Sequence, residues 1–161
     1  MRRYKERGEL SESSRGFTLL ELLAAMVILL LLTSVALPVA RMQVQHTREV
    51  ELRRALRQMR EAIDRYKDFT DRGMIPLTPD SFGYPPDLDT LVTGVPLKGS
   101  ATAKYKFLRR IPIDAMTGKA DWGMRSMQDD PDSQSWGGSN VFDIHSQSRG
   151  IALDGTKYAD W

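Results

Sequence analysis

The chain has 161 residues, of which 41% are hydrophobic and 27% are charged, and its formal net charge is +2. This length accommodates about one ordinary domain. The chain contains no cysteine, which excludes disulfides and thiolate metal sites. Only one long apolar run is present, which excludes a membrane protein with several spans. The basic excess lies in residues 1–16, so the remainder has no net charge that would attract nucleic acid.

The N-terminal part of the sequence divides into a polar segment and an apolar segment. Residues 1–16 hold five bases and three acids, which predicts a disordered leader that stays in the cytoplasm. Residues 17–40 carry a single charge, Glu21. As a helix they are roughly 36 Å long, which is enough to cross a bilayer. Pro38 removes one helical hydrogen bond and predicts a kink near the end of this segment.

Residues 41–72 are strongly charged and continue the helical pattern. They carry one apolar stripe at helical spacing, formed by Leu52, Leu56, Met59, Ile63 and Tyr66. Two pairs of opposite charges stand four residues apart in the order that favours ion pairing, Glu49 with Arg53 and Glu61 with Arg65. Because neither glycine nor proline interrupts this segment, we expect one continuous helix over about 17–70, amphipathic in its second half.

Residues 73–161 contain seven of the eight prolines and all three tryptophans, which predicts a compact head rich in turns. We expect a short helix at Asp87–Val92 and strands at Trp122–Ser126, Asn140–Ser146 and Gly150–Leu153. So few apolar runs make a thin core, which needs the apolar stripe of the long helix. The predicted fold class is α+β, with one long N-terminal helix packed on a small head that has a short antiparallel β-sheet.

The residues Arg15-Gly16-Phe17-Thr18-Leu19-Leu20-Glu21, followed by the apolar run, resemble the processing signal of the type IV prepilin-like family. This family includes the type IV pilins and the pseudopilins of type II secretion. The resemblance implies a pilin-like fold and a prepilin peptidase that cuts between Gly16 and Phe17. It also implies that Phe17 is then N-methylated. Pro38 stands where the family often has a helix-kinking proline.

Glu21 stands where the family carries its glutamate. A carboxylate at the start of a membrane helix is costly unless it is paired, and the new amine of Phe17 is a suitable partner. In the family, the glutamate of one subunit is thought to neutralise the amine of its neighbour. The resemblance therefore implies that Glu21 and Pro38 act in assembly.

The head resembles that of the major pseudopilin of type II secretion, the G-type component. The resemblance rests on the lack of cysteine and on three segments, Tyr84–Val92, Leu108–Asp114 and Phe142–Ser146. It implies a single-pass inner-membrane protein with a periplasmic head, polymerising into a filament that drives protein export. The implied partners are further copies of the chain, minor pseudopilins, the prepilin peptidase and the inner-membrane assembly platform.

In that family a structural calcium ion binds a loop near the C-terminus. The resemblance implies Asp154 and Asp160 as carboxylate ligands, with Ser146 or Ser148 as a hydroxyl ligand, and calcium prefers six to eight oxygens. The loop departs from the usual pattern, because only five residues separate the two aspartates. The alternative is that Asp154 shapes a turn and that Asp160 is solvated.

Other patterns predict little chemistry. Asp129, Asp130 and Asp132 are predicted to form a solvated acidic loop, because their spacing differs from that of an EF-hand. His46 and His145 lie in no metal-binding motif, and the sequence shows no catalytic motif, so we expect no enzyme.

Alternative functions remain open: a type IV pilin or minor pseudopilin for adhesion, motility or DNA uptake, or a simple signal anchor. A secreted periplasmic binding module, cut near Ser34-Val35-Ala36, is a further alternative.

Overall fold

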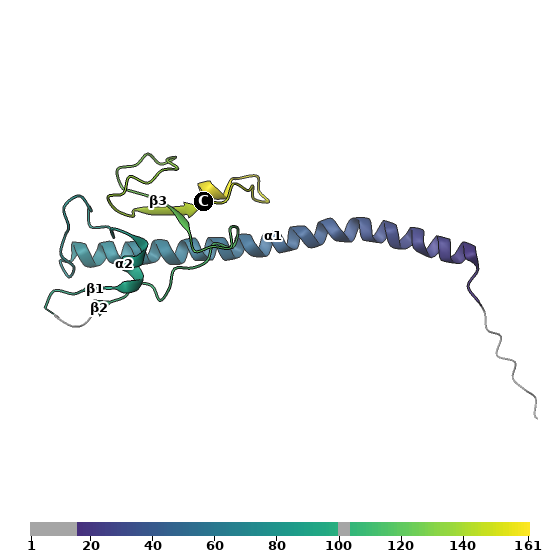
Figure 1. Ribbon diagram of the computed structural model, residues 1–161, viewed down its shortest axis with the longest axis horizontal. Helices are drawn as coiled ribbons and strands as arrows, with labels where there is room; N and C mark the ends of the chain where they lie inside the picture. The colour runs from purple at the N-terminus through teal and green to yellow at the C-terminus, as the bar shows by residue number, and fades with distance from the viewer. Residues whose placement is uncertain (1–15, 100–103) are drawn as a thin grey trace, which may run out of the picture. The chain divides into compact units, whose positions relative to one another are not determined.

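The computed structural model describes residues 16–99 and 104–161 (Figure 1). The predicted leader lies outside these residues except for Gly16. The elements in chain order are α1 (Leu19–Asp71), α2 (Leu88–Thr93), β1 (Val95–Pro96), β2 (Lys104–Tyr105), β3 (Trp122–Arg125), β4 (Asp143–Ser146) and the 3-10 helix η1 (Tyr158–Asp160). One long N-terminal helix and a small head with two short antiparallel sheets make an α+β, pilin-like fold, which confirms the predicted fold class.

The helix α1 has 53 residues and continues through Pro38 without a break. The chain divides into two compact units, which end and begin at Ala40 and Arg41. In the first unit the helix exposes a nearly unbroken series of leucine, isoleucine, valine and methionine side chains. This part of α1 is long and apolar enough to span a membrane.

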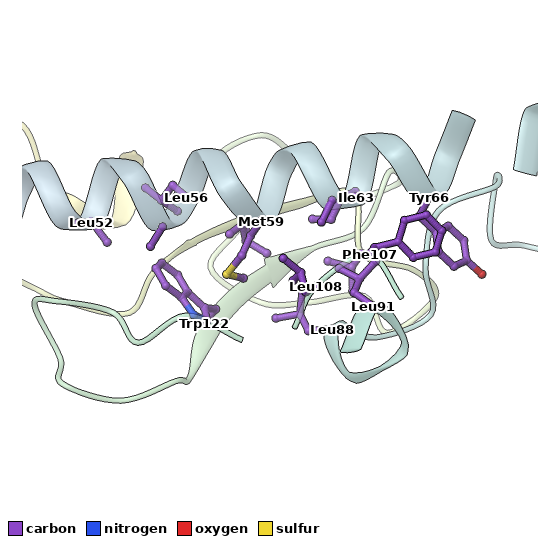
Figure 2. Close-up of a cluster of buried hydrophobic side chains, with 14 of the residues drawn as sticks. Leu52, Leu56, Met59, Ile63, Tyr66, Leu88, Leu91, Phe107, Leu108 and Trp122 are labelled. Carbon is purple, nitrogen blue, oxygen red and sulfur yellow. The ribbon is translucent and has the colours of Figure 1, made fainter. Parts of the chain in front are cut away.

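The second unit buries the predicted apolar stripe of α1. Figure 2 shows the stripe side chains facing α2, the segment after β2, and β3, with the labelled partners Leu88, Leu91, Phe107, Leu108 and Trp122. All five stripe residues are buried, which confirms the helical period read from the sequence. The tilted and edge-on contacts among Tyr66, Phe69 and Phe107 extend this core toward the end of the helix. The head is therefore built on the helix.

Short elements surround this core. Asp87 caps α2 with a carboxylate oxygen that accepts from the backbone N–H of Thr90 at 2.6 Å. The two hairpins pair β1 with β2 and β3 with β4, both antiparallel, with Trp122 opposite Ser146 in the second. In the view of Figure 1, β1 and β2 lie below the second half of α1 and β3 lies above it.

One local prediction is wrong, and one hairpin has no counterpart in the predicted elements. The predicted strand at Gly150–Leu153 is only an isolated bridge between Ile151 and Lys157, because the turn at Gly155 reverses the chain after a few residues. The β1–β2 hairpin was not predicted, since each of its strands is only two residues long.

The charged pairs of α1 also behave differently from each other. Glu61 and Arg65 form the predicted ion pair at 3.6 Å, with both side chains exposed. The predicted pair of Glu49 with Arg53 does not form. Glu49 is instead buried beneath hydrogen-bond donors of residues 150–161, and Arg53 pairs with Asp154 at 3.2 Å.

Candidate processing and assembly site

The predicted cleavage site lies immediately before α1. Gly16, Phe17 and Thr18 are non-helical and exposed, and no described atom beyond the chain neighbours of Gly16 lies within 4 Å of where a side chain at Gly16 would begin. Thr18 is the N-cap, because its hydroxyl accepts from the backbone N–H of Glu21 at 3.2 Å. The bond between Gly16 and Phe17 is thus exposed in a non-helical segment that immediately precedes the capped start of α1.

The role of Thr18 was missed from the sequence, although the pattern Thr-x-x-Glu at residues 18–21 is the signature of a capping box. Glu21 lies in the first turn of α1, where the partial positive charge of the helix terminus favours a carboxylate. Within residues 16–99 and 104–161, Glu21 has no ion-pair partner. Its pairing with an amine therefore stays a prediction about assembled subunits.

Pro38 lies inside α1 and supplies no N–H for the carbonyl of Ser34. Just before it, the hydroxyls of Thr33 and Ser34 donate to the carbonyls of Leu29 and Leu31, both at 2.7 Å. Such bonds from hydroxyls back to the helix often accompany bending. The alternative cleavage site at residues 34–36 falls within this continuous helix, unlike the bond at Gly16.

The four residues predicted as calcium ligands are divided between two pockets. Ser146, Ser148 and Asp160 line an open pocket of about 710 Å³ beside β4 and η1. Asp154 lines a different pocket of about 410 Å³, together with Glu49 and other α1 residues. In the described parts of the chain, no three acidic or histidine side chains are grouped so as to hold a metal ion.

The ligand oxygens also have other partners. One carboxylate oxygen of Asp154 accepts from the N–H of Thr156 at 3.0 Å and from its hydroxyl at 2.6 Å. The other carboxylate oxygen faces Arg53, and these contacts, those from Thr156 above all, lower the pKa of Asp154. The hydroxyl of Ser146 donates to Asp114 at 2.6 Å. The positive charge of Arg53 beside the carboxylate of Asp154 makes binding of a second cation there unfavourable. These residues therefore do not fit a calcium ion in this arrangement.

Asp129 organises the predicted acidic loop. Its carboxylate accepts from the backbone N–H groups of Ser126 at 2.7 Å and Gly137 at 3.0 Å. These hydrogen bonds lower the pKa of Asp129 below its ordinary value. Asp130 and Asp132 are exposed, as expected for a solvated loop.

The two histidines lie at separate places. His46 is exposed and lines the pocket of Asp154, whereas His145 in β4 is only 2% exposed. The ring of His145 lies against Gly123 of β3, and its Nδ1 has no hydrogen-bond partner in the described part of the chain. Burial, followed by the nearby Arg125 guanidinium, lowers the pKa of His145, so its neutral form is favoured.

Comparison with known proteins gives a match over the segment that contains the first of these sites. A family model for the prokaryotic N-terminal methylation motif matches residues 13–37. Neither curated proteins nor solved structures give a match to the chain. The matched residues contain the Gly16–Phe17 bond, Glu21 and the apolar start of α1. The chain therefore carries the signal of a type IV pilin- or pseudopilin-like precursor, which implies processing by a prepilin peptidase and pilus-like assembly.

Proposed function

We propose that this protein is the major structural subunit of a type II secretion pseudopilus. After cleavage between Gly16 and Phe17, the apolar first halves of α1 from many subunits pack together, and the heads remain exposed. Growth of this filament from the inner membrane into the periplasm pushes substrates through an outer-membrane channel. The subunit contributes structure and movement and has no catalytic role.

The observation that carries the proposal is the methylation motif at the start of an exposed apolar helix. The motif covers residues 13–37, and the apolar side chains that follow Phe17 are exposed along the first half of α1. An apolar surface of this length requires lipid or other apolar helices around it. Cleavage before Phe17 leaves the surface on the mature chain, which supports both membrane anchoring and a filament core.

The choice of a major pseudopilin rests on the head. The chain has no cysteine that could close the loop disulfide of many type IV pilins. The segment Leu108–Asp114, which resembles the G-type component, has a defined structural role here. Its Asp114 is fully buried and binds β4 through Ser146, and the carbonyl of Pro112 accepts from the indole of Trp122 at 3.0 Å. The resemblance thus concerns residues that hold the head together.

Mass spectrometry of the N-terminus tests the processing step. The chain recovered from its native membrane should begin with methylated Phe17, and a Gly16→Val variant should remain uncut. Gly8→Val, which changes a glycine away from the predicted cut, is the matched control and should be processed normally. A chain beginning near Leu37 would instead support a secreted module, and an uncut wild-type chain would support a signal anchor.

A second experiment distinguishes the two machines. Deleting the gene in its native host should abolish secretion of exported enzymes into the medium and leave surface pili unchanged. Restoring the wild-type gene should restore secretion, whereas Gly16→Val should not. Loss of surface pili or of twitching motility with normal secretion would favour the type IV pilin alternative.

A further inference from the structure

The loop of residues 150–161, here called the terminal loop, lies against α1 and the β3–β4 hairpin. It contains the isolated bridge of Ile151 with Lys157, the turn at Gly155 and the 3-10 helix η1. In the family that this chain resembles, a calcium ion holds the corresponding loop. The residues that would bind calcium here do not fit the ion, so a different set of contacts must order the loop.

Glu49 is the first such contact. It is 6% exposed, and the same carboxylate oxygen, Oε1, accepts from the backbone N–H of Leu153 and from the hydroxyl of Tyr158, both at 2.9 Å. These donors lie on the two sides of the Gly155 turn, so one side chain of α1 fixes both arms of the loop. Gln45, one helical turn earlier, adds a hydrogen bond to the carbonyl of Ile151 at 3.0 Å.

Two arginines of α1 contact the turn and the end of the loop. Arg53 pairs with Asp154 at 3.2 Å, and its guanidinium lies 4.1 Å from the ring centroid of Trp161. Arg60 donates to the backbone carbonyl of Trp161 at 2.8 Å and pairs with Asp143 of β4 at 2.7 Å. Because Arg60 contacts both segments, it joins the end of the loop to the hairpin.

Gln45, Glu49 and Arg53 stand on successive turns of α1, and Arg60 stands two turns later on the same helix face. We infer that they form a metal-independent clasp that orders the terminal loop, in the role that calcium has in the family resembled. Glu49 is the central member, because it is buried and accepts from both arms. The inference concerns the fold of one subunit, so it holds whichever filament the protein forms.

The charges explain why the clasp and a calcium ion exclude each other. Calcium binding at Asp154 would require that carboxylate to leave Arg53 and the hydroxyl of Thr156. The released guanidinium would then stand next to the cation, which is unfavourable. Arg53 therefore takes the place of the ion as the positive charge beside Asp154.

Hydrogen–deuterium exchange on the full-length protein in detergent micelles tests the clasp. In the wild-type protein, peptides covering residues 150–161 should exchange at the same rate in 5 mM calcium chloride and in EGTA. Glu49→Ala should speed exchange of the loop by about tenfold or more in both buffers, because two donors lose their acceptor. The matched control is Glu51→Ala, which removes an exposed glutamate from the same helix and should leave the exchange unchanged.

Two further variants keep the test decisive. Tyr158→Phe removes one donor to Glu49 and one acceptor for Gln45, and it should speed exchange of the loop severalfold, even if Glu49→Ala fails to fold. Asp160→Asn, which would remove the negative charge of a predicted calcium ligand, should have no effect. A calcium-dependent slowing of exchange that Asp160→Asn abolishes would overturn the inference, as would unchanged exchange in both Glu49→Ala and Tyr158→Phe.

Discussion

Replacing Asp114 with alanine should destabilise the head by about 3 kcal/mol. Asp114 has no exposed surface, and one carboxylate oxygen accepts from the N–H groups of Met116 at 2.7 Å and Thr117 at 3.3 Å. The other oxygen accepts from the hydroxyl of Ser146 at 2.6 Å. Leaving a buried donor without an acceptor costs about 1–3 kcal/mol. Ser146 is fully buried and bears most of this cost, whereas water reaches the other two donors more readily.

Urea unfolding of the detergent-solubilised protein, followed by tryptophan fluorescence, measures this loss. Trp122 is a suitable reporter because its indole donates to the carbonyl of Pro112, two residues before Asp114. Asp114→Asn keeps the shape and one acceptor oxygen, so it should cost about 1 kcal/mol. Asp130→Ala, at an exposed aspartate, is the control and should change the stability by less than about 0.5 kcal/mol. The reasoning fails if Asp114→Ala is no more destabilising than this control.

Three further predictions concern the core and its histidine. Because burial lowers the pKa of His145 from its ordinary value of 6.5, the unfolded chain binds this proton more readily. The free energy of unfolding should therefore be highest above pH 6.5 and fall as the pH decreases through the folded-state pKa, and His145→Gln should flatten this dependence in urea titrations. Gly123→Ala should be destabilising because its new methyl group would overlap the His145 ring. A double-mutant cycle with His145→Ala should give a clear coupling energy between the two positions, and a coupling energy of zero would contradict the contact. Met59→Ala, at a fully buried stripe position, should cost about 2–5 kcal/mol in the same assay, whereas Arg57→Ala, on an exposed position of the same turn, should cost little.

The long helix and its buried face were predictable because both depend on periodic patterns that act over many residues. The stripe from Leu52 to Tyr66 repeats often enough to fix one face of a helix, whatever the head contributes. The short helix α2 was also predictable, since Asp87 is a strong N-cap residue. Both helices were therefore predictable from neighbouring residues alone, because α1 depends on one repeated apolar spacing and α2 on one capping side chain.

The terminal loop was not predictable in the same way. Its partners are Gln45, Glu49 and Arg53, about a hundred residues earlier in the chain, and no local pattern links them. The spacing of Glu49 and Arg53 is correct for a helix, but the two side chains do not pair with each other. The hydrogen bonds that buried Glu49 accepts from the terminal loop contribute more than the few tenths of a kcal/mol of an exposed ion pair. At the processing site, by contrast, the residues Gly16, Phe17 and Glu21 follow one another in sequence, so the motif could be read directly.

The stripe of α1 has a mechanical consequence. The residues of Arg41–Asp71 belong to the same compact unit as the head, and their buried side chains form one wall of its core. A force applied along this part of the helix therefore reaches the head through tightly packed side chains and not through a compliant linker. This part of the helix and the head therefore move together as one rigid unit. A single cavity in the stripe would make the connection between them less rigid.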